Sequence, residues 1–249
     1  MQLHANIYRI LTSVIAVLLF LVFSASCTIH DEITVYPDDS GFSVFEIVID
    51  EFFLEVLDDY SEFLPEEEAD LSRLDAATLE SEILAWEYVT SADVRSADET
   101  YFEGEFEFTD ARYVLQRAED LQEEVEQIDV FSYEASGRTQ QITIHIDIDN
   151  YSQLEDLAPI LKDPAFSTFG PEENRDVTEE EYYEMVSYML GEEGPDKIRG
   201  SEIRIVVHTT RPIIRQRGGR VVNPRQVVFT IPLIEFLLLH EPLQFSVTW

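Results

Sequence analysis

The stretch TQQITIHIDID, from Thr139 to Asp149, decides the fold class because it alternates between apolar and polar residues. One face of the predicted strand carries four isoleucines, namely Ile142, Ile144, Ile146 and Ile148. A period of two is typical of a strand with one buried face and one hydrated face. With the turn Ser136-Gly137-Arg138 and a preceding strand over residues 128–133, the stretch predicts a β-hairpin.

Further strands are predicted on both sides of this hairpin along the sequence. Residues 33–36 and 42–49 flank a turn-rich segment and form a second predicted hairpin. A competing interpretation places apolar residues from Phe45 to Tyr60 on the stripe of one helix. The remaining predicted strands cover residues 84–94, 101–108, 202–209, 226–231 and 245–249, with turn signals at Gly218-Gly219 and Asn223-Pro224.

Helical segments separate these strands. Thr178 and the three glutamates after it are typical of a capped helix, predicted through Leu190 with Gly191 at its end. Its apolar stripe either packs into the core or lines an apolar pocket, and consists of Tyr182, Met185, Tyr188 and Met189. Other helices are predicted over residues 50–64, from Pro65 onward, and over 111–127, 152–161 and 234–239. This order predicts an α+β fold, with antiparallel sheets built from hairpins and helices packed on one side.

The N-terminal segment has the composition of an export signal. One cation and no acid precede an apolar run from Leu11 to Phe23, which is shorter than the ~20 residues of a membrane span. Ser24-Ala25-Ser26 then lead to Cys27, the single cysteine of the chain. This arrangement resembles the lipobox of bacterial lipoproteins, with Ser24 where leucine is preferred. The same residues satisfy the small-x-small rule of ordinary signal cleavage, which would leave an exported protein without a lipid.

The lipoprotein resemblance implies that cleavage leaves Cys27 first, with a thioether-linked diacylglycerol and an amide-linked third chain. Two or three chains hold a protein on a bilayer because each buried methylene adds about 0.8 kcal/mol. We therefore predict a signal peptide over residues 1–26 and one exported domain over 27–249, anchored to a membrane through Cys27 and without a later transmembrane span. Thr28 stands where an Asp retains some lipoproteins at the inner membrane, so the outer membrane or cell surface is the expected location.

The charge distribution excludes one class of partner and indicates another. A formal net charge of −35 repels nucleic acid and anionic lipid, and no nucleic-acid partner is expected. From Arg199 to Arg225, in contrast, the chain carries seven arginines and one acid, Glu202. Because the arginine fork binds phosphate and carboxylate groups bidentately, this stretch is either an anion-binding patch or a counterweight to the acidic half of the protein. The candidate binding residues are Arg211, Arg215, Arg217, Arg220 and Arg225.

A search for catalytic chemistry finds one candidate cluster. No Gly-rich phosphate loop, His-Glu-x-x-His or Gly-x-Ser-x-Gly motif occurs in the sequence. His145, Asp147 and Asp149 would share one strand face, where an imidazole and carboxylates suit a divalent cation. An exposed strand of a protein this acidic gives the same pattern without a function. We therefore assign no catalytic residue, metal or cofactor.

Two short segments resemble the LppM-type family of envelope lipoprotein domains. They are ITVYPDDSG at residues 33–41 and RGGRVVNPRQVVFTIPL at residues 217–233. The resemblance implies a membrane-tethered, non-enzymatic domain that holds a lipid or glycolipid. We therefore expect a binding or structural module for an amphipathic ligand or an envelope partner. The alternatives are a secreted hydrolase using carboxylates or a metal around His145, and a purely structural acidic surface protein.

Overall fold

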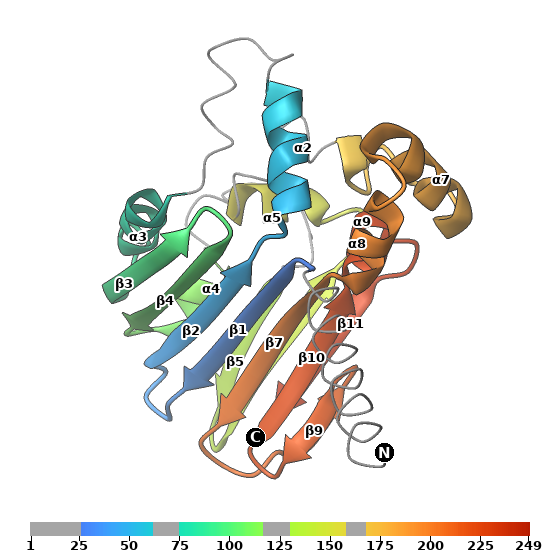
Figure 1. Cartoon of the computed structure of the whole chain (residues 1–249). Helices are drawn as coiled ribbons and strands as arrows, with labels where there is room; N and C mark the ends of the chain where they lie inside the picture. Colours follow the sequence, from blue (N-terminus) through green and yellow to red (C-terminus); the bar gives the residue numbers. More distant parts are fainter. Residues whose placement is uncertain (1–25, 62–74, 117–129, 158–167) are drawn as a thin grey trace, which may run out of the picture.

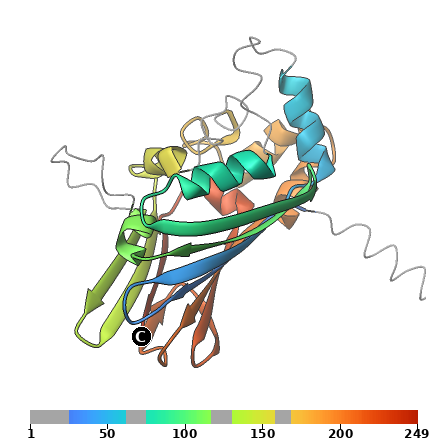
Figure 2. The same cartoon turned by 90° about the vertical axis from the view of Figure 1, so that its left-hand side faces the viewer.

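Two β-sheets packed against each other form the centre of the protein (Figure 1, Figure 2). The computed structural model describes residues 26–61, 75–116, 130–157 and 168–249. The large sheet has the strand order β3-β4-β2-β1-β7-β10-β9, and the small sheet has the order β5-β6-β11-β8. The large sheet consists of β1 (Thr28–Val35), β2 (Gly41–Val48), β3 (Val89–Asp98), β4 (Tyr101–Phe108), β7 (Glu202–Thr209), β9 (Arg220–Asn223) and β10 (Gln226–Pro232). The small sheet consists of β5 (Phe131–Ser136), β6 (Thr139–Ile146), β8 (Arg215–Arg217) and β11 (Leu243–Thr248).

The pairing of these strands is mostly antiparallel. Among the described strands, β1 and β7 form a parallel pair, and the other eight pairs are antiparallel. The parallel pair runs from Thr28 opposite Glu202 to Val35 opposite Thr209. It joins the beginning of the described chain to its C-terminal third. The predicted α+β class with antiparallel hairpins is confirmed.

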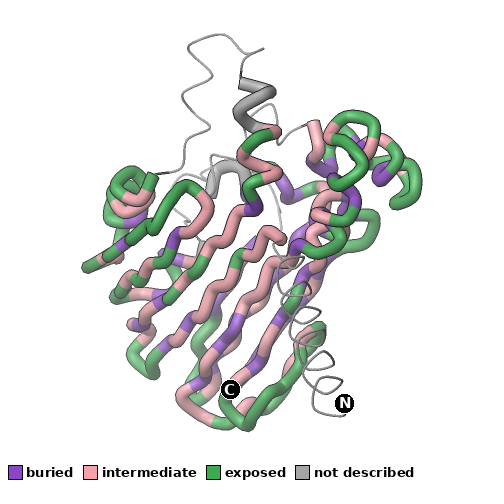
Figure 3. The backbone as a smooth tube through the Cα atoms, in the orientation of Figure 1, coloured by how far each residue is buried: buried purple, intermediate pink, exposed green. Residues whose placement is uncertain are grey.

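The main hydrophobic core lies between the two sheets. From the small sheet, alternate residues of β6 and β11 are buried. Figure 3 shows the same kind of alternation along β10 of the large sheet. From the large sheet, Val207 and Phe229 are fully buried, and the Phe229 ring lies 5.1 Å from the ring of Phe245. Each such side chain contributes about 1.5–3 kcal/mol when it leaves water. The alternation that predicts β6 therefore predicts its buried face correctly.

Most helices gather at one end of the sheets, which we call the helix end (Figure 1). The helices are α2 (Glu51–Ser61), α3 (Ala76–Leu84), α4 (Ala111–Gln116), α5 (Tyr151–Leu157), α7 (Glu179–Leu190), α8 (Gly194–Gly200) and α9 (Leu233–Leu238). A second hydrophobic cluster joins α7, α8 and α9 through Tyr182, Val186, Ile198 and Leu238. Thr178 forms the predicted capping box with Glu181 at the start of α7. No helix of the described residues is both long and apolar enough to cross a membrane.

The predicted strand over residues 84–94 is wrong in its first part. Helix α3 starts after Asp75, whose side chain caps it by accepting from the N–H groups of Ala77 and Thr78, each at 3.0 Å, and the helix continues to Leu84. A turn then follows, and β3 begins at Val89. In the last turn of α3, Ile83 is 2% exposed and Leu84 is 46% exposed.

The structure decides between the hairpin and the single helix for residues 42–60. Strand β2 pairs with β1 on one side and with β4 on the other, so Phe45 lies in a central strand. Helix α2 begins only after this strand ends. Two sets of ladder hydrogen bonds outweigh the helical spacing of the apolar residues, so the hairpin is confirmed and the long helix is wrong.

The Gly218-Gly219 turn is a corner between the sheets instead of a hairpin turn. Strand β8 before it pairs with β11, and strand β9 after it pairs with β10. Gly218 has a φ of 77°, and a Cβ on it would lie 2.4 Å from the carbonyl oxygen of Gln244. A Cβ on Gly219 would lie 2.5 Å from the Phe229 ring. Both positions need glycine because the chain passes close to other residues while it changes sheets.

Several predicted boundaries lie outside the described residues. They are the export signal up to residue 25, the end of the helix predicted over 50–64, the helix from Pro65, most of the helix predicted over 111–127, and the end of the one predicted over 152–161. The described parts of three of these helices are α2, α4 and α5.

Candidate functional site

Two hydrogen bonds of its backbone hold Cys27 at the start of the central strands β1 and β7 of the large sheet. Its N–H donates to Ser201 Oγ at 3.0 Å, and its carbonyl oxygen accepts from the N–H of Glu202 at 3.1 Å. Strand β1 begins at the next residue, Thr28. The chain therefore passes from Cys27 into the folded sheet without a linker.

An ion pair lies beside the sulfur of Cys27. The N–H of Asp50 donates to Cys27 Sγ at 3.4 Å, and Asp50 Oδ2 lies 2.7 Å from Lys197 Nζ. The side chain of Asp50 is only 4% exposed, and its Oδ1 accepts from the N–H of Phe52 at the start of α2. Ser201 Oγ donates to the carbonyl of Lys197 at 2.8 Å. We call Cys27, Asp50, Lys197 and Ser201 the Cys27 cluster.

Burial disfavours the reactive thiolate form of Cys27 in the folded, unmodified chain. Burial raises the pKa of the Cys27 thiol to about 11 from 9.0, although the backbone N–H of Asp50 opposes this rise. Because the thiolate is the reactive form, we expect iodoacetamide at pH 8 to alkylate the folded full chain about 100-fold more slowly than the urea-unfolded chain. Mass spectrometry over time measures both rates. An exposed reference thiol, Ser136→Cys, should react at nearly the same rate in both states, and a Cys27 as fast as this reference would contradict the prediction.

The five candidate arginines divide into one structural residue and four exposed residues. Arg211 is half-buried and donates to the carbonyl of Arg138 and, at 3.1 Å, to Gln140 Oε1. It thereby connects the segment after β7 to the hairpin of β5 and β6. The other four are exposed and lie on β8, on β9 and in the turn before β10, namely Arg215, Arg217, Arg220 and Arg225.

Three exposed apolar residues lie next to these arginines in the chain. Ile214 is 67% exposed, and Val221 and Val222 are 46% and 47% exposed. We call this exposed region of β8, β9 and the adjoining turns the arginine end, and it consists of Ile214, Arg215, Arg217, Arg220, Val221, Val222 and Arg225. Within the described residues, none of its arginines has a carboxylate within 4.0 Å, whereas four arginines elsewhere do: Arg95, Arg112, Arg199 and Arg204. Among the described residues, therefore, no direct ion pair occupies the guanidinium groups of the arginine end.

His145 and Asp147 close a turn and do not form the predicted three-residue face. Strand β6 ends at Ile146, and His145 Nε2 lies 2.7 Å from Asp147 Oδ2. Asp147 Oδ1 accepts from the N–H groups of Asp149 and Asn150. Partial burial raises the pKa of the Asp147 carboxyl. The hydrogen bonds from His145 and from the two backbone N–H groups lower it by more, so the pKa of Asp147 lies below its usual value. The described residues contain no group of three His, Cys, Asp or Glu side chains placed to hold a metal ion.

The parallel pairing of β1 with β7 creates a cluster that the sequence does not indicate. Glu32 Oε1 lies 2.9 Å from His30 Nε2, and Glu32 Oε2 lies 2.7 Å from His208 Nε2. The hydrogen bond with His30, followed by that with His208, lowers the pKa of the Glu32 carboxyl. His30 and His208 stand far apart in the sequence, and only the pairing of their strands places them on one face of the sheet.

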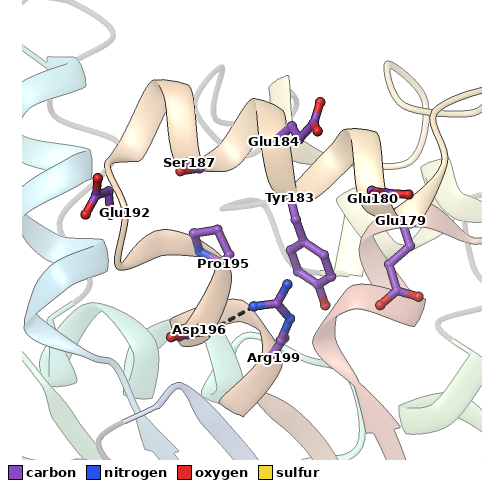
Figure 4. Close-up of a pocket in the computed structure, with 9 residues that line it drawn as sticks. All are labelled: Glu179, Glu180, Tyr183, Glu184, Ser187, Glu192, Pro195, Asp196 and Arg199. Carbon is purple, nitrogen blue, oxygen red and sulfur yellow. Dashed lines mark hydrogen bonds and ion pairs between the residues drawn. The ribbon is translucent and has the colours of Figure 1, made fainter.

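A groove lies between α7 and α8 (Figure 4). It has a volume of about 710 Å³ and is open to solvent. The Arg199 guanidinium lies over the Tyr183 ring at 4.0 Å and pairs with Asp196 at 2.8 Å. The remaining lining is mostly acidic, with Glu179, Glu180, Glu184 and Glu192 among its residues. This groove has the wrong charge for an anionic headgroup, so it adds nothing to the anion-binding hypothesis.

The apolar stripe predicted on α7 does not line this groove. Tyr182 is fully buried in the helix cluster, where its hydroxyl donates to the carbonyl of Phe169 at 2.9 Å. Met185 packs against the same cluster. Tyr188, in contrast, is 91% exposed, and Met189 is 43% exposed. The first half of the stripe is core, and the second half faces solvent.

Comparisons with known proteins find one similarity of structure. No family model matches the sequence, and no curated protein matches it. The chain is similar to the folded domain of the LppM protein of Mycobacterium tuberculosis, determined by NMR. The two share 12% sequence identity with a TM-score of 0.40, over 89% of this chain and 88% of that one. LppM also typifies the family that the sequence resemblance indicated, while membership of that family and lipidation of Cys27 stay predictions.

Proposed function

We propose that this chain is an exported envelope lipoprotein, anchored to a membrane through Cys27, whose domain over residues 27–249 binds an amphipathic ligand or an envelope partner without catalysing a reaction. The location of Cys27 is the observation that best supports this proposal. It is the residue directly before β1, so a lipid on it would place the folded sheet directly at the bilayer surface.

The hydrogen bonds of the Cys27 cluster are compatible with both lipid attachments. An acylated amino group still has one N–H, which can donate to Ser201 Oγ as the peptide N–H does now at 3.0 Å. A thioether sulfur remains a weak acceptor for the N–H of Asp50. Processing and lipidation would therefore replace the thiol hydrogen by the diacylglycerol carbon and the peptide bond to Ser26 by a fatty amide, and would retain the contacts that fix the start of β1.

The arginine end supports the binding role. Its four exposed guanidinium groups can each bind a phosphate or carboxylate in bidentate geometry. The exposed side chains of Ile214, Val221 and Val222 add apolar surface beside these charges. A ligand that combines an anionic headgroup with apolar chains matches both features.

Phase separation and labelling test the anchor. Produced in a bacterium that processes lipoproteins, the full chain should enter the detergent phase in Triton X-114 and incorporate radiolabelled palmitate. The Cys27→Ser variant should enter the aqueous phase and remain unlabelled, because it lacks the sulfur nucleophile. A wild-type chain that stays in the aqueous phase without label would overturn the proposal.

A further inference from the structure

The Cys27 cluster lies at the start of β1 and β7, and the arginine end lies farther along the large sheet. Strands β1 and β7 both start beside Cys27 and run in parallel to Val35 and Thr209. The strand pairings place Arg220 level with Glu32, about 16 Å along the strands from Cys27, and Arg225 beside Thr209, about 26 Å along them. In Figure 1, β9 lies at the end of the large sheet away from the helices, and β7 runs toward that end. The position of Cys27 therefore determines which way the arginine end points.

The arginine end is too far from the anchoring bilayer to bind it. Charges exposed to solvent are screened over about 8–10 Å at physiological ionic strength, which is less than the roughly 16 Å along the strands from Cys27 to the level of Arg220. Because the chain enters β1 directly after Cys27, the described residues provide no tether that would let the domain turn over. The arginines must therefore meet their partner on the side away from the anchor.

The arginine end forms where the edge strands of both sheets meet. Strand β8 is the edge of the small sheet, β9 is the edge of the large sheet, and Gly218-Gly219 joins them. From residue 203 to residue 234 the sequence contains no Asp or Glu, although the chain has 51 acids. This end is thus a cationic surface on a strongly anionic protein.

We propose that the arginine end binds the surface of a second, anionic lipid bilayer, so that the anchored protein connects two membrane surfaces. This inference rests on the proposed function, because the anchor at Cys27 fixes the orientation. A bilayer accounts for the apolar residues as well as for the charges. Aliphatic side chains gain free energy at the boundary between headgroups and acyl chains, whereas a hydrated anionic polymer offers them no such environment.

Vesicle capture tests the inference on the full chain. The protein is reconstituted into neutral phosphatidylcholine vesicles and mixed with dye-labelled vesicles that contain phosphatidylglycerol. We expect it to float with the neutral vesicles and to collect the anionic vesicles, with capture falling as salt increases. Because each arginine near an anionic surface contributes roughly fivefold to binding, Arg217→Gln with Arg220→Gln should weaken capture about 25-fold.

Two further variants test whether vesicle capture depends on these particular arginines and on the apolar side chains beside them. The matched control, Arg95→Gln with Arg204→Gln, removes the same formal charge from arginines that are already ion-paired, and should leave capture within about twofold. Val221→Thr with Val222→Thr keeps all charges and good strand formers, and should weaken capture of a bilayer by about 3- to 10-fold. If the valine variant captures vesicles as well as the wild type does, and soluble polyphosphate displaces them, the partner is an anionic polymer. That result would overturn the proposal that the partner is a bilayer.

The experiment distinguishes a failure of the proposed lipid anchor from a failure of the proposed binding to a second membrane. If the chain floats with neutral vesicles but collects no anionic vesicles, the lipid anchor is supported and the proposed binding to a second membrane is wrong. If the chain does not float, the lipid anchor is wrong, and the proposed connection between two membranes fails with it. Equal capture by the arginine variant and the wild type would also overturn the inference.

Discussion

Replacing Lys197 with Met is expected to lower the free energy of unfolding by about 3–5 kcal/mol. The substitution leaves the carboxylate of Asp50, which is 4% exposed, without the ammonium group 2.7 Å away. A buried charge without its partner costs several kcal/mol, and Met fills nearly the same volume as the Lys stem. Urea unfolding at pH 7.5, followed by circular dichroism, measures the change.

The control removes both charges of this pair. Asp50→Asn with Lys197→Met leaves no uncompensated charge, and the Asn oxygen can still accept from the N–H of Phe52 at the start of α2. We expect this double variant to recover most of the lost stability. If Lys197→Met alone costs less than about 1 kcal/mol, the pair is not the buried contact that holds α2 and α8 beside Cys27.

The same substitution connects stability to the proposed anchor. Lys197 also lowers the pKa of the Cys27 thiol, while the charge of Asp50 raises it. The Cys27 cluster therefore joins the start of β1, the start of α2 and the end of α8 around one sulfur atom. Local loosening of this cluster would expose that sulfur, and the alkylation rate of Cys27 would detect it separately from global unfolding.

Local patterns in the sequence predict the elements whose contacts are local. The alternating isoleucines predict β6 and its buried face, and Thr178 with Glu181 predicts the start of α7. Both signals depend on residues only a few positions apart. The strand pattern continues one isoleucine too far, because Asp147 accepts backbone hydrogen bonds and closes a turn that ends the strand before Ile148.

Features that depend on distant pairing could not be predicted in the same way. The parallel pairing of β1 with β7 brings His30 and His208 to one carboxylate, and no local pattern relates the two residues. The Gly218-Gly219 corner has the sequence of a hairpin turn, and only the choice of partner strands shows that the chain changes sheets.

For the arginine stretch, too, some features follow from neighbouring residues in the sequence and others follow only from how distant strands pack. Its charge and its five candidate residues are evident in the sequence. Its division into Arg211, which binds backbone and side-chain oxygens near the β5–β6 turn, and four exposed residues depends on how the sheets pack. The sequence therefore shows the charge of this stretch, the fold determines which of its side chains remain accessible, and anion binding stays a prediction.

Replacing Trp249 with Ala is expected to lower the free energy of unfolding by about 3–5 kcal/mol. The Trp249 side chain is the largest among those that are fully buried, with 1% exposure, and it lies in the core between the sheets. Its backbone also exchanges two hydrogen bonds with Gln140, at 3.0 and 2.9 Å, which align the end of β11 with the start of β6. Loss of the ring would leave a cavity at the point where this register is set.

A Phe at position 249 distinguishes packing from the polar group of the indole. Within the described residues, the buried Nε1–H of Trp249 has no hydrogen-bond acceptor, so removing it sacrifices no hydrogen bond. We expect Trp249→Phe to cost no more than about half as much as Trp249→Ala in urea unfolding, because most of the apolar volume remains. Hydrogen exchange at the amide of Gln140 should be faster in the Ala variant and nearly unchanged in the Phe variant. Equal losses in the two variants would show that the indole N–H has a partner that matters, and that the ring does more than fill the space between the sheets.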